Sequence, residues 1–216
     1  MKKTNTTALG NGSSLFNAHF VFNTLNIIQH YIILNDKKAA LLSLNKFSKL
    51  FRQYLLLSKS GSTSIGQEIT IIHLYLQLQV LRYTGKFTYQ LICDKSLQPS
   101  KKIPVVQFAV IIDDLTESLL KKGEKEMHLC VRFKDDPDNV LLVLEAGDFI
   151  ETGFSEPNAQ KRYWQETGIY WRKHLDMFNS NDHYQVSYIE EKILPADDAQ
   201  KSYMWRISIY IPFINR

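Results

Sequence analysis

The chain has 216 residues, of which 44% are hydrophobic and 22% are charged, and its formal net charge is +4. This composition is typical of a folded globular protein and excludes an intrinsically disordered chain. The longest apolar runs, at 109–112 and 140–144, are far too short to cross a bilayer. Residues 1–14 are polar and lack the apolar stretch of a secretory signal, so we expect a flexible terminus there and a cytoplasmic protein.

The first third of the chain is predicted to be helical. Residues 16–34 are rich in Phe, Leu and Ile, and Asn35-Asp36 predicts a turn before a second helix over 37–58. After a loop at 60–64, apolar residues follow two faces of a third predicted helix over 65–83. An apolar surface that nearly encircles a helix predicts that this helix packs against partners on both sides.

From residue 86 onward the pattern changes to a mixture of strands and helices. Helices first and a mixed sheet with helices afterwards indicate an α+β fold in two parts. We place a helical part at 15–84 and an α/β part at 85–216. Strands are predicted at 86–93, 127–133, 140–145, 183–191 and 203–211, and further helices at 105–122 and 164–178.

The segment 17–26 (NAHFVFNTLN) carries the candidate chemistry. A neutral imidazole can attack a phosphoryl group through a free ring nitrogen. The i,i+4 spacing puts His19 and Asn23 on one helical face, where the amide could orient the ring. These residues alone leave open a core or capping role for His19.

This segment resembles the NPHFLFNTLN signature of the LytS/YehU-type sensor histidine kinases, with Ala18 in place of the Pro. Residues 48–57 (SKLFRQYLLL) and 65–83 (IGQEITIIHLYLQLQVLRY) are similar to two further motifs of that family. The resemblance implies that His19 accepts a phosphoryl group, that residues 16–58 form a homodimer, and that a GHKL-type ATP-binding fold follows. Four side chains stand at the positions expected in the third motif: Glu68, Tyr75, Gln79 and Arg82.

The resemblance also implies ATP and Mg²⁺ as cofactors, held in part by a helix with the motif VENAIKHG. Counting from Pro104 puts Ile112-Asp113-Asp114 over the Val-Glu-Asn core, whereas counting back from Gly123 puts Thr116-Glu117-Ser118 there. Neither alignment keeps the Asn, and Asp114 is the better Mg²⁺ candidate because Mg²⁺ prefers carboxylate oxygens. As like charges at i,i+4, Asp113 and Glu117 are also expected on a solvated face.

The adenine and lid motifs of the resembled family are altered as well. Glu145 takes the place of the Asp of DNGxG, Gly147 is retained, and Phe149 replaces the second Gly. Bulky side chains where a nucleotide needs close backbone approach predict weak ATP binding. The candidate nucleotide-binding residues are Asp114, Glu117, Ser118, Glu145, Gly147 and, in the lid, Gly168.

Three functions are compatible with these observations. The first is a two-component signalling protein with His19 as phosphoacceptor and an eroded ATP site, acting as a weak kinase or a pseudokinase scaffold. The second is a fully active ATP-dependent histidine kinase. The third is a basic module that binds nucleic acid or another acidic partner, although the mild net charge argues against nucleic acid. Its best stretch consists of Arg162, Tyr163, Trp164, Trp171, Arg172 and Lys173.

The partners follow from the same resemblance. It implies a response regulator, of the LytTR DNA-binding type, to which the phosphoryl group passes. A membrane-bound kinase that phosphorylates His19 is a further partner compatible with an eroded ATP site.

Overall fold

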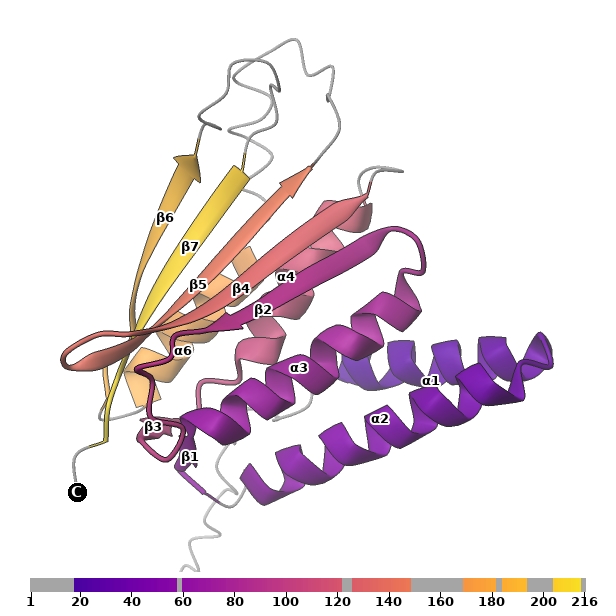
Figure 1. The fold of residues 1–216 in the computed structure, drawn as a ribbon, viewed down its shortest axis with the longest axis horizontal. Coiled ribbons are helices and arrows are strands. Elements are labelled where there is room, and N and C mark those ends of the chain that lie inside the picture. Colours follow the sequence, from indigo (N-terminus) through magenta and orange to yellow (C-terminus); the bar gives the residue numbers. More distant parts are fainter. Residues whose placement is uncertain are drawn as a thin grey trace, which may run out of the picture.

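The computed structural model describes residues 18–57, 60–121, 126–148, 169–181, 184–193 and 204–214. It confirms an α+β fold in which helices precede a mixed sheet (Figure 1). The helices are α1 (Ala18–Ile33), α2 (Lys37–Leu57), α3 (Ile65–Arg82), α4 (Phe108–Lys121) and α6 (Ile169–Asn181). The strands are β1 (Ser62–Ser64), β2 (Phe87–Cys93), β3 (Lys102–Pro104), β4 (Met127–Asp135), β5 (Asn139–Asp148), β6 (Ser187–Ile193) and β7 (Met204–Pro212).

Helices α1 and α2 form an antiparallel hairpin, and the predicted turn between them is confirmed. Asn35 adopts a left-handed conformation with φ of 57°, and the amide of Asp36 then donates to the carbonyl of Tyr31 at 2.9 Å. Asn is one of the few residues that tolerate this conformation, so it ends α1 cleanly. The carboxylate of Asp36 accepts from the amide of Ala39 at 2.9 Å and caps α2.

Helix α3 lies between the hairpin and the α/β part, as its two apolar faces predict. It begins at a capping box in which Ser64 and Gln67 exchange hydrogen bonds. One side of α3 packs against α1 and α2, and the other contacts α4 and β2. One hydrophobic core runs from Leu50 in α2 through α3 to Ile211 in β7, so the hairpin and the sheet share buried surface.

The main sheet has the strand order β2-β4-β5-β7-β6, with β2 parallel to β4 and the other pairs antiparallel. Side chains alternate between its faces. Leu142, Leu144 and Ala146 of β5 point into the core, on the side where α4 and α6 lie behind the sheet in Figure 1. The residues between them, including Glu145, therefore belong to the opposite face.

The structure also differs from the sequence-based predictions. The predicted loop at 60–64 contains β1, which pairs with β3 in a small antiparallel sheet. The predicted helix at 105–122 begins only at Phe108, because Gln107 has φ of 61° and interrupts helical geometry. Strand β6 begins at Ser187 rather than at 183. The predicted terminus over 1–14 and the helix start over 164–168 lie outside the described residues.

The division of the chain into two parts between residues 84 and 85 stays a prediction. One hydrophobic core contains residues from both sides of this boundary. As for the bilayer, the helices within the described ranges are too short or too polar to span one.

Candidate functional site

The predicted phosphoacceptor lies at the beginning of α1. His19 is the second residue of that helix, and its side chain is outside the described part of the structure. Helical spacing puts positions 19, 23, 26 and 30 on one strip of α1. Of these, Asn23 is half-buried, and Asn26 and His30 are exposed. The strip can therefore be approached from solvent at Asn26 and His30, while the role of His19 stays a prediction.

The hairpin exposes an unusual amount of apolar surface. Eleven large hydrophobic side chains of α1, α2 and their turn are between 38% and 74% exposed, whereas the rest of the described chain has three such side chains. Large contiguous apolar surfaces on a folded protein mark interaction sites. The eleven are Phe22, Leu25, Ile32, Ile33, Leu34, Leu41, Leu42, Leu44, Phe51, Leu55 and Leu56.

Helix α4 carries the residues aligned with the Mg²⁺-binding motif, and it presents them in two directions. Asp113 and Glu117, one turn apart, face α3 and its residue Arg82. Asp114 faces the beginning of α6, and Ser118 follows it one turn later. The two sequence alignments differ by four residues, which is about one helical turn. Both therefore put the Mg²⁺ position on the strip of Asp114 and Ser118.

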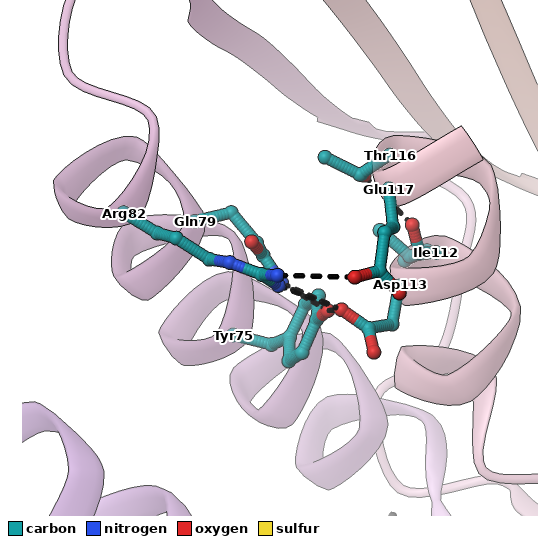
Figure 2. A network of polar contacts seen from close by, with 7 residues as sticks. All are labelled: Tyr75, Gln79, Arg82, Ile112, Asp113, Thr116 and Glu117. Carbon is teal, nitrogen blue, oxygen red and sulfur yellow. Dashed lines mark hydrogen bonds and ion pairs between the residues drawn. The ribbon is translucent and has the colours of Figure 1, made fainter. Parts of the chain in front are cut away.

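Asp113 is the centre of a buried polar network between α3 and α4 (Figure 2). The hydroxyl of Tyr75 donates to its Oδ1 at 2.5 Å, and Nε2 of Gln79 donates to the same oxygen at 3.1 Å. Arg82 bridges Asp113 at 3.4 Å and Glu117 at 3.3 Å. Tyr75, Gln79 and Arg82 are three of the four residues by which α3 resembles the histidine kinase motif. The motif residues therefore form the polar contact between the two helices.

The prediction that Asp113 and Glu117 lie on a solvated face is wrong. Asp113 is 3% exposed, and Glu117 is half-buried. The guanidinium of Arg82 lies near both carboxylates and offsets the repulsion between them. Sequence reasoning missed Asp113 as a hub because its partners are 31 to 38 positions away in the chain. The signal was present in the matching spacing of Tyr75, Gln79 and Arg82 on α3.

Asp114 contacts the beginning of α6. Its Oδ2 accepts a hydrogen bond at 3.2 Å from the amide of Trp171, the third residue of that helix. Burial raises the pKa of Asp114 to about 6, and the hydrogen bond from Trp171 opposes this rise. The first amides of a helix lack partners within the helix and attract anions. The carboxylate of Asp114 thus accepts from a helix N-terminal amide to which an anionic ligand could otherwise bind.

Glu145, predicted at the adenine position, is engaged on the sheet face opposite α4. Its Oε2 pairs with Arg132 of β4, and its Oε1 accepts from Arg206 of β7 at 2.6 Å and 2.8 Å. Glu145 is buried beneath these two half-exposed arginines. The structure therefore gives both of its carboxylate oxygens a structural partner.

The remaining predicted site residues are placed as follows. Ser118 is half-buried on α4. Gly147 belongs to β5 and pairs with His128 and Met204 in the register of the sheet. Gly168 lies outside the described residues. Among the described side chains, no group of three or more His, Cys, Asp or Glu is arranged to hold a metal ion.

Glu68, the fourth motif residue of α3, is fully buried. Its carboxylate accepts from the amide of Phe108, the first residue of α4, which ties α3 to the beginning of that helix. Burial raises the pKa of Glu68 from 4.5 to about 7, although the hydrogen bond from Phe108 acts in the opposite direction. The native state therefore binds this proton more tightly than the unfolded state does.

A pH dependence of stability follows from Glu68. The contribution of Glu68 to the free energy of unfolding is complete below pH 4.5 and is lost as the pH rises through 7. The total loss is about 3 kcal/mol. Glu68→Gln mimics the protonated acid. It should therefore reduce the decrease in the free energy of unfolding with rising pH and stabilise the protein above neutral pH. Urea unfolding at several pH values between about 5 and 8 checks this, with the exposed Glu126→Gln as control. Equal slopes for wild type and Glu68→Gln would contradict the prediction.

The structure also bears on the third function, a basic and aromatic binding surface around residues 162–173. Trp171 is buried, and Arg172 forms a bidentate pair with Glu190 of β6 at 2.6 Å. Lys173 is exposed, and residues 162–164 lie outside the described ranges. The described aromatic and arginine side chains of this stretch therefore serve packing and ion pairing.

Comparison with known proteins connects this arrangement to signalling. The histidine kinase family matches residues 11–87. The sensor protein LytS of Streptococcus mutans serotype c is 27% identical over 160 residues, which cover 71% of this chain and 25% of that protein. LytS of Streptococcus agalactiae serotype V is 30% identical over 120 residues, which cover 56% of this chain and 20% of that protein. The chain thus spans about a quarter or less of the length of these relatives.

Among solved structures, the catalytic domain of the histidine kinase ThkA is similar, with a TM-score of 0.40 and 6% identity over 69% of this chain and 94% of that domain. The family match covers α1, α2 and α3 and includes the segment NAHFVFNTLN and the residues of the α3–α4 network that lie on α3. The first part of the chain, 11–87, therefore matches the histidine kinase family, and the chain is similar to LytS-type sensor proteins.

Proposed function

We propose that this chain is a dimeric phosphoacceptor of two-component signalling in the cytoplasm, in which His19 receives a phosphoryl group and the α/β part binds ATP weakly. The observation that carries the proposal is the exposed apolar surface of the α1–α2 hairpin, next to the strip that begins at His19. A second copy that covers this surface would form a helical bundle. The phosphoacceptor strips of both copies would then border the bundle.

The exposed side chains of α2 support this arrangement by their spacing. Leu41, Leu44, Phe51 and Leu55 share one strip of the helix with Lys37 and Ser48, and these six positions are three or four residues apart. This stripe is narrow, as expected for a seam between packed helices rather than for a face buried within one chain. We name these six positions the apolar stripe.

Weak ATP binding is supported by the partners of the acids at the predicted nucleotide positions. Asp113 and Glu117 pair with Arg82, Asp114 accepts from the amide of Trp171, and Glu145 pairs with two arginines. As placed, these carboxylates do not fit a Mg²⁺-nucleotide complex, since each would have to leave an internal partner. Breaking a buried charged contact costs about 1–3 kcal/mol, so several together weaken binding strongly.

Calorimetric titration of the full chain with ATP and Mg²⁺ tests the nucleotide part of the proposal. We expect a dissociation constant above about 1 mM, because the loss of about 4 kcal/mol of binding energy corresponds to roughly a thousandfold in affinity. The catalytic domain of the histidine kinase ThkA serves as the positive control. A dissociation constant in the low micromolar range would indicate a fully active ATP-dependent kinase instead.

The proposal includes the onward transfer of the phosphoryl group. By family resemblance the acceptor is a response regulator, of the LytTR type. A second kinase, including a membrane-bound one, would supply the phosphoryl group where the chain's own ATP binding is too weak.

A further inference from the structure

Gln29 is a polar residue in the middle of the exposed apolar surface of α1. Helical spacing puts Phe22, Leu25, Gln29 and Ile32 on one strip of that helix, with Ile33 at its border. The four hydrophobic side chains are between 45% and 74% exposed, and Gln29 is exposed as well. Gln29 lies one turn from Leu25 and one turn from Ile32, so apolar side chains flank it in both directions along the helix.

The side chain of Gln29 is available to a group outside the chain. Among the described residues it has no hydrogen-bond partner, whereas Gln77 and Gln79 of α3 both bind neighbouring side chains. A carboxamide carries both donors and an acceptor, so it can pair with an identical carboxamide. If a second copy covers the apolar surface of the hairpin, the amide of Gln29 needs a partner within the new interface.

The turn between α1 and α2 decides which residues lie at one level of the hairpin. Counting from the turn places Gln29 at the level between Leu41 and Leu44 of the apolar stripe. The polar members of that stripe, Lys37 and Ser48, are five and six residues from this level, which is about 8 and 9 Å along the axis. At the level of Gln29, the apolar stripe therefore contributes leucines.

We propose that Gln29 specifies a two-chain assembly in fixed register by pairing with the same residue of the second copy, with both turns at one end of the bundle. This inference rests on the proposed function and adds the residue that aligns the two copies. In a two-fold symmetric interface, a residue at the axis meets its own equivalent. A shift by one turn would bury each amide against leucines without a partner.

Specification by one polar residue has a physical basis in helical bundles. An apolar seam alone tolerates several registers and several numbers of chains, because leucines pack against leucines in each of them. One polar residue in the seam restricts this choice and lowers the stability of the assembly. Gln29 fits this role because its neighbours along the strip are all apolar.

An alternative arrangement has the two turns at opposite ends of the bundle. If the hairpins overlap fully, counting from both ends brings Gln29 of one copy close to the level of Ser48 of the second copy. Ser48 is exposed, and its hydroxyl can pair with an amide. Replacement of Ser48 therefore distinguishes the two arrangements.

The test compares variants of the full chain by sedimentation velocity and sedimentation equilibrium. Gln29→Leu removes the amide at similar size, and Gln29→Glu converts the pair into two facing carboxylates. Asn45→Leu and Asn45→Glu make matched changes at an exposed amide of α2 outside the apolar stripe. Ser48→Leu reports on the alternative arrangement, and melting temperatures confirm that all variants fold.

We expect Gln29→Leu to associate about tenfold more tightly than wild type and to form trimers or tetramers beside the dimer. The Gln29→Glu dimer should dissociate about a hundredfold more readily at about pH 8 and recover at about pH 5, where facing acids take up protons. Both Asn45 variants should stay within about twofold of wild type, and Ser48→Leu should keep a single dimer.

Three results would overturn the inference. Gln29 variants that behave like the Asn45 controls would show that the amide faces solvent. A Gln29→Leu protein that forms only a dimer would show that the amide does not restrict the assembly. A mixture of assemblies in Ser48→Leu would favour the arrangement with opposite turns.

The outcome can be separated from that of the proposed function. A monomeric wild-type chain would overturn both the dimer and the role of Gln29. A dimeric wild-type chain whose Gln29 variants match the controls would overturn the inference alone, and the proposed function would stand.

Discussion

Replacement of Asp113 by Ala should destabilise the protein by about 3 kcal/mol or more. The change leaves the hydroxyl of Tyr75 without its acceptor and removes one of the two carboxylates that Arg82 bridges. Urea unfolding followed by circular dichroism measures the loss. Asp176→Ala, an exposed acid on α6, is the matched control and should change stability by less than about 0.5 kcal/mol.

A double-mutant cycle separates the interaction from the packing. Arg82→Met alone leaves Asp113 and Glu117 as neighbouring like charges, so it should be at least as damaging as Asp113→Ala. The double variant Arg82→Met/Asp113→Ala removes both partners and should cost less than the sum of the two single changes. Strict additivity, or an Asp113→Ala protein as stable as wild type, would show that the α3–α4 network does not act as a unit.

The second large effect is expected on the assembly of the protein. Leu41→Glu/Leu44→Glu places two acids on the apolar stripe, at side chains that are 60% and 44% exposed in the single chain. Because these positions contribute little to the monomer core, the variant should fold. Burying two carboxylates in a helical seam is costly, so its dimer should dissociate at least about a hundredfold more readily.

Sedimentation equilibrium across micromolar concentrations measures this change. Ile92→Glu/Ile189→Glu is the matched control, since both side chains are similarly exposed but lie on the outer strands β2 and β6 of the sheet. We expect a dimer for wild type and control and a monomer for the stripe variant. A monomeric wild-type chain, or a stripe variant with unchanged mass, would remove the support for a dimeric hairpin.

The sequence predicts the helices of this protein better than its short strands. Helical periodicity predicts α1, α2 and α3 correctly, because each helix buries a continuous apolar face and is bounded by local signals such as Asn35-Asp36 and the Ser64 cap. Strands β1 and β3 are missed, since three residues are too few to show alternation. They exist because residues 62–64 and 102–104 pair with each other across the fold.

The site is predictable only in part, and the reason is distance along the chain. Local spacing correctly makes Asp113 and Glu117 neighbours on one face of α4 but says nothing about what that face meets. Likewise, the sequence does not reveal that Glu145 pairs with Arg132 and Arg206, because these residues meet only through the register of the sheet. Residue identity and spacing therefore indicate the family resemblance, whereas the tertiary structure decides which charged groups pair with one another.

The α3–α4 network lies between the hairpin and the sheet. Motif residues of α3 hold α4 through Asp113, Glu117 and the amide of Phe108, while the opposite side of α3 packs against the hairpin. Helix α3 therefore joins the hairpin to α4.

The most direct test of the central claim is the site of phosphorylation. The full chain is incubated with phosphoramidate, which transfers its phosphoryl group to an imidazole nitrogen and releases ammonia, and the product is mapped by tandem mass spectrometry. We expect one acid-labile phosphoryl group on His19, which forms before any on the other five histidines and is lost in His19→Ala. Labelling of His30 or His73 at the same rate, or an unchanged total in His19→Ala, would contradict it.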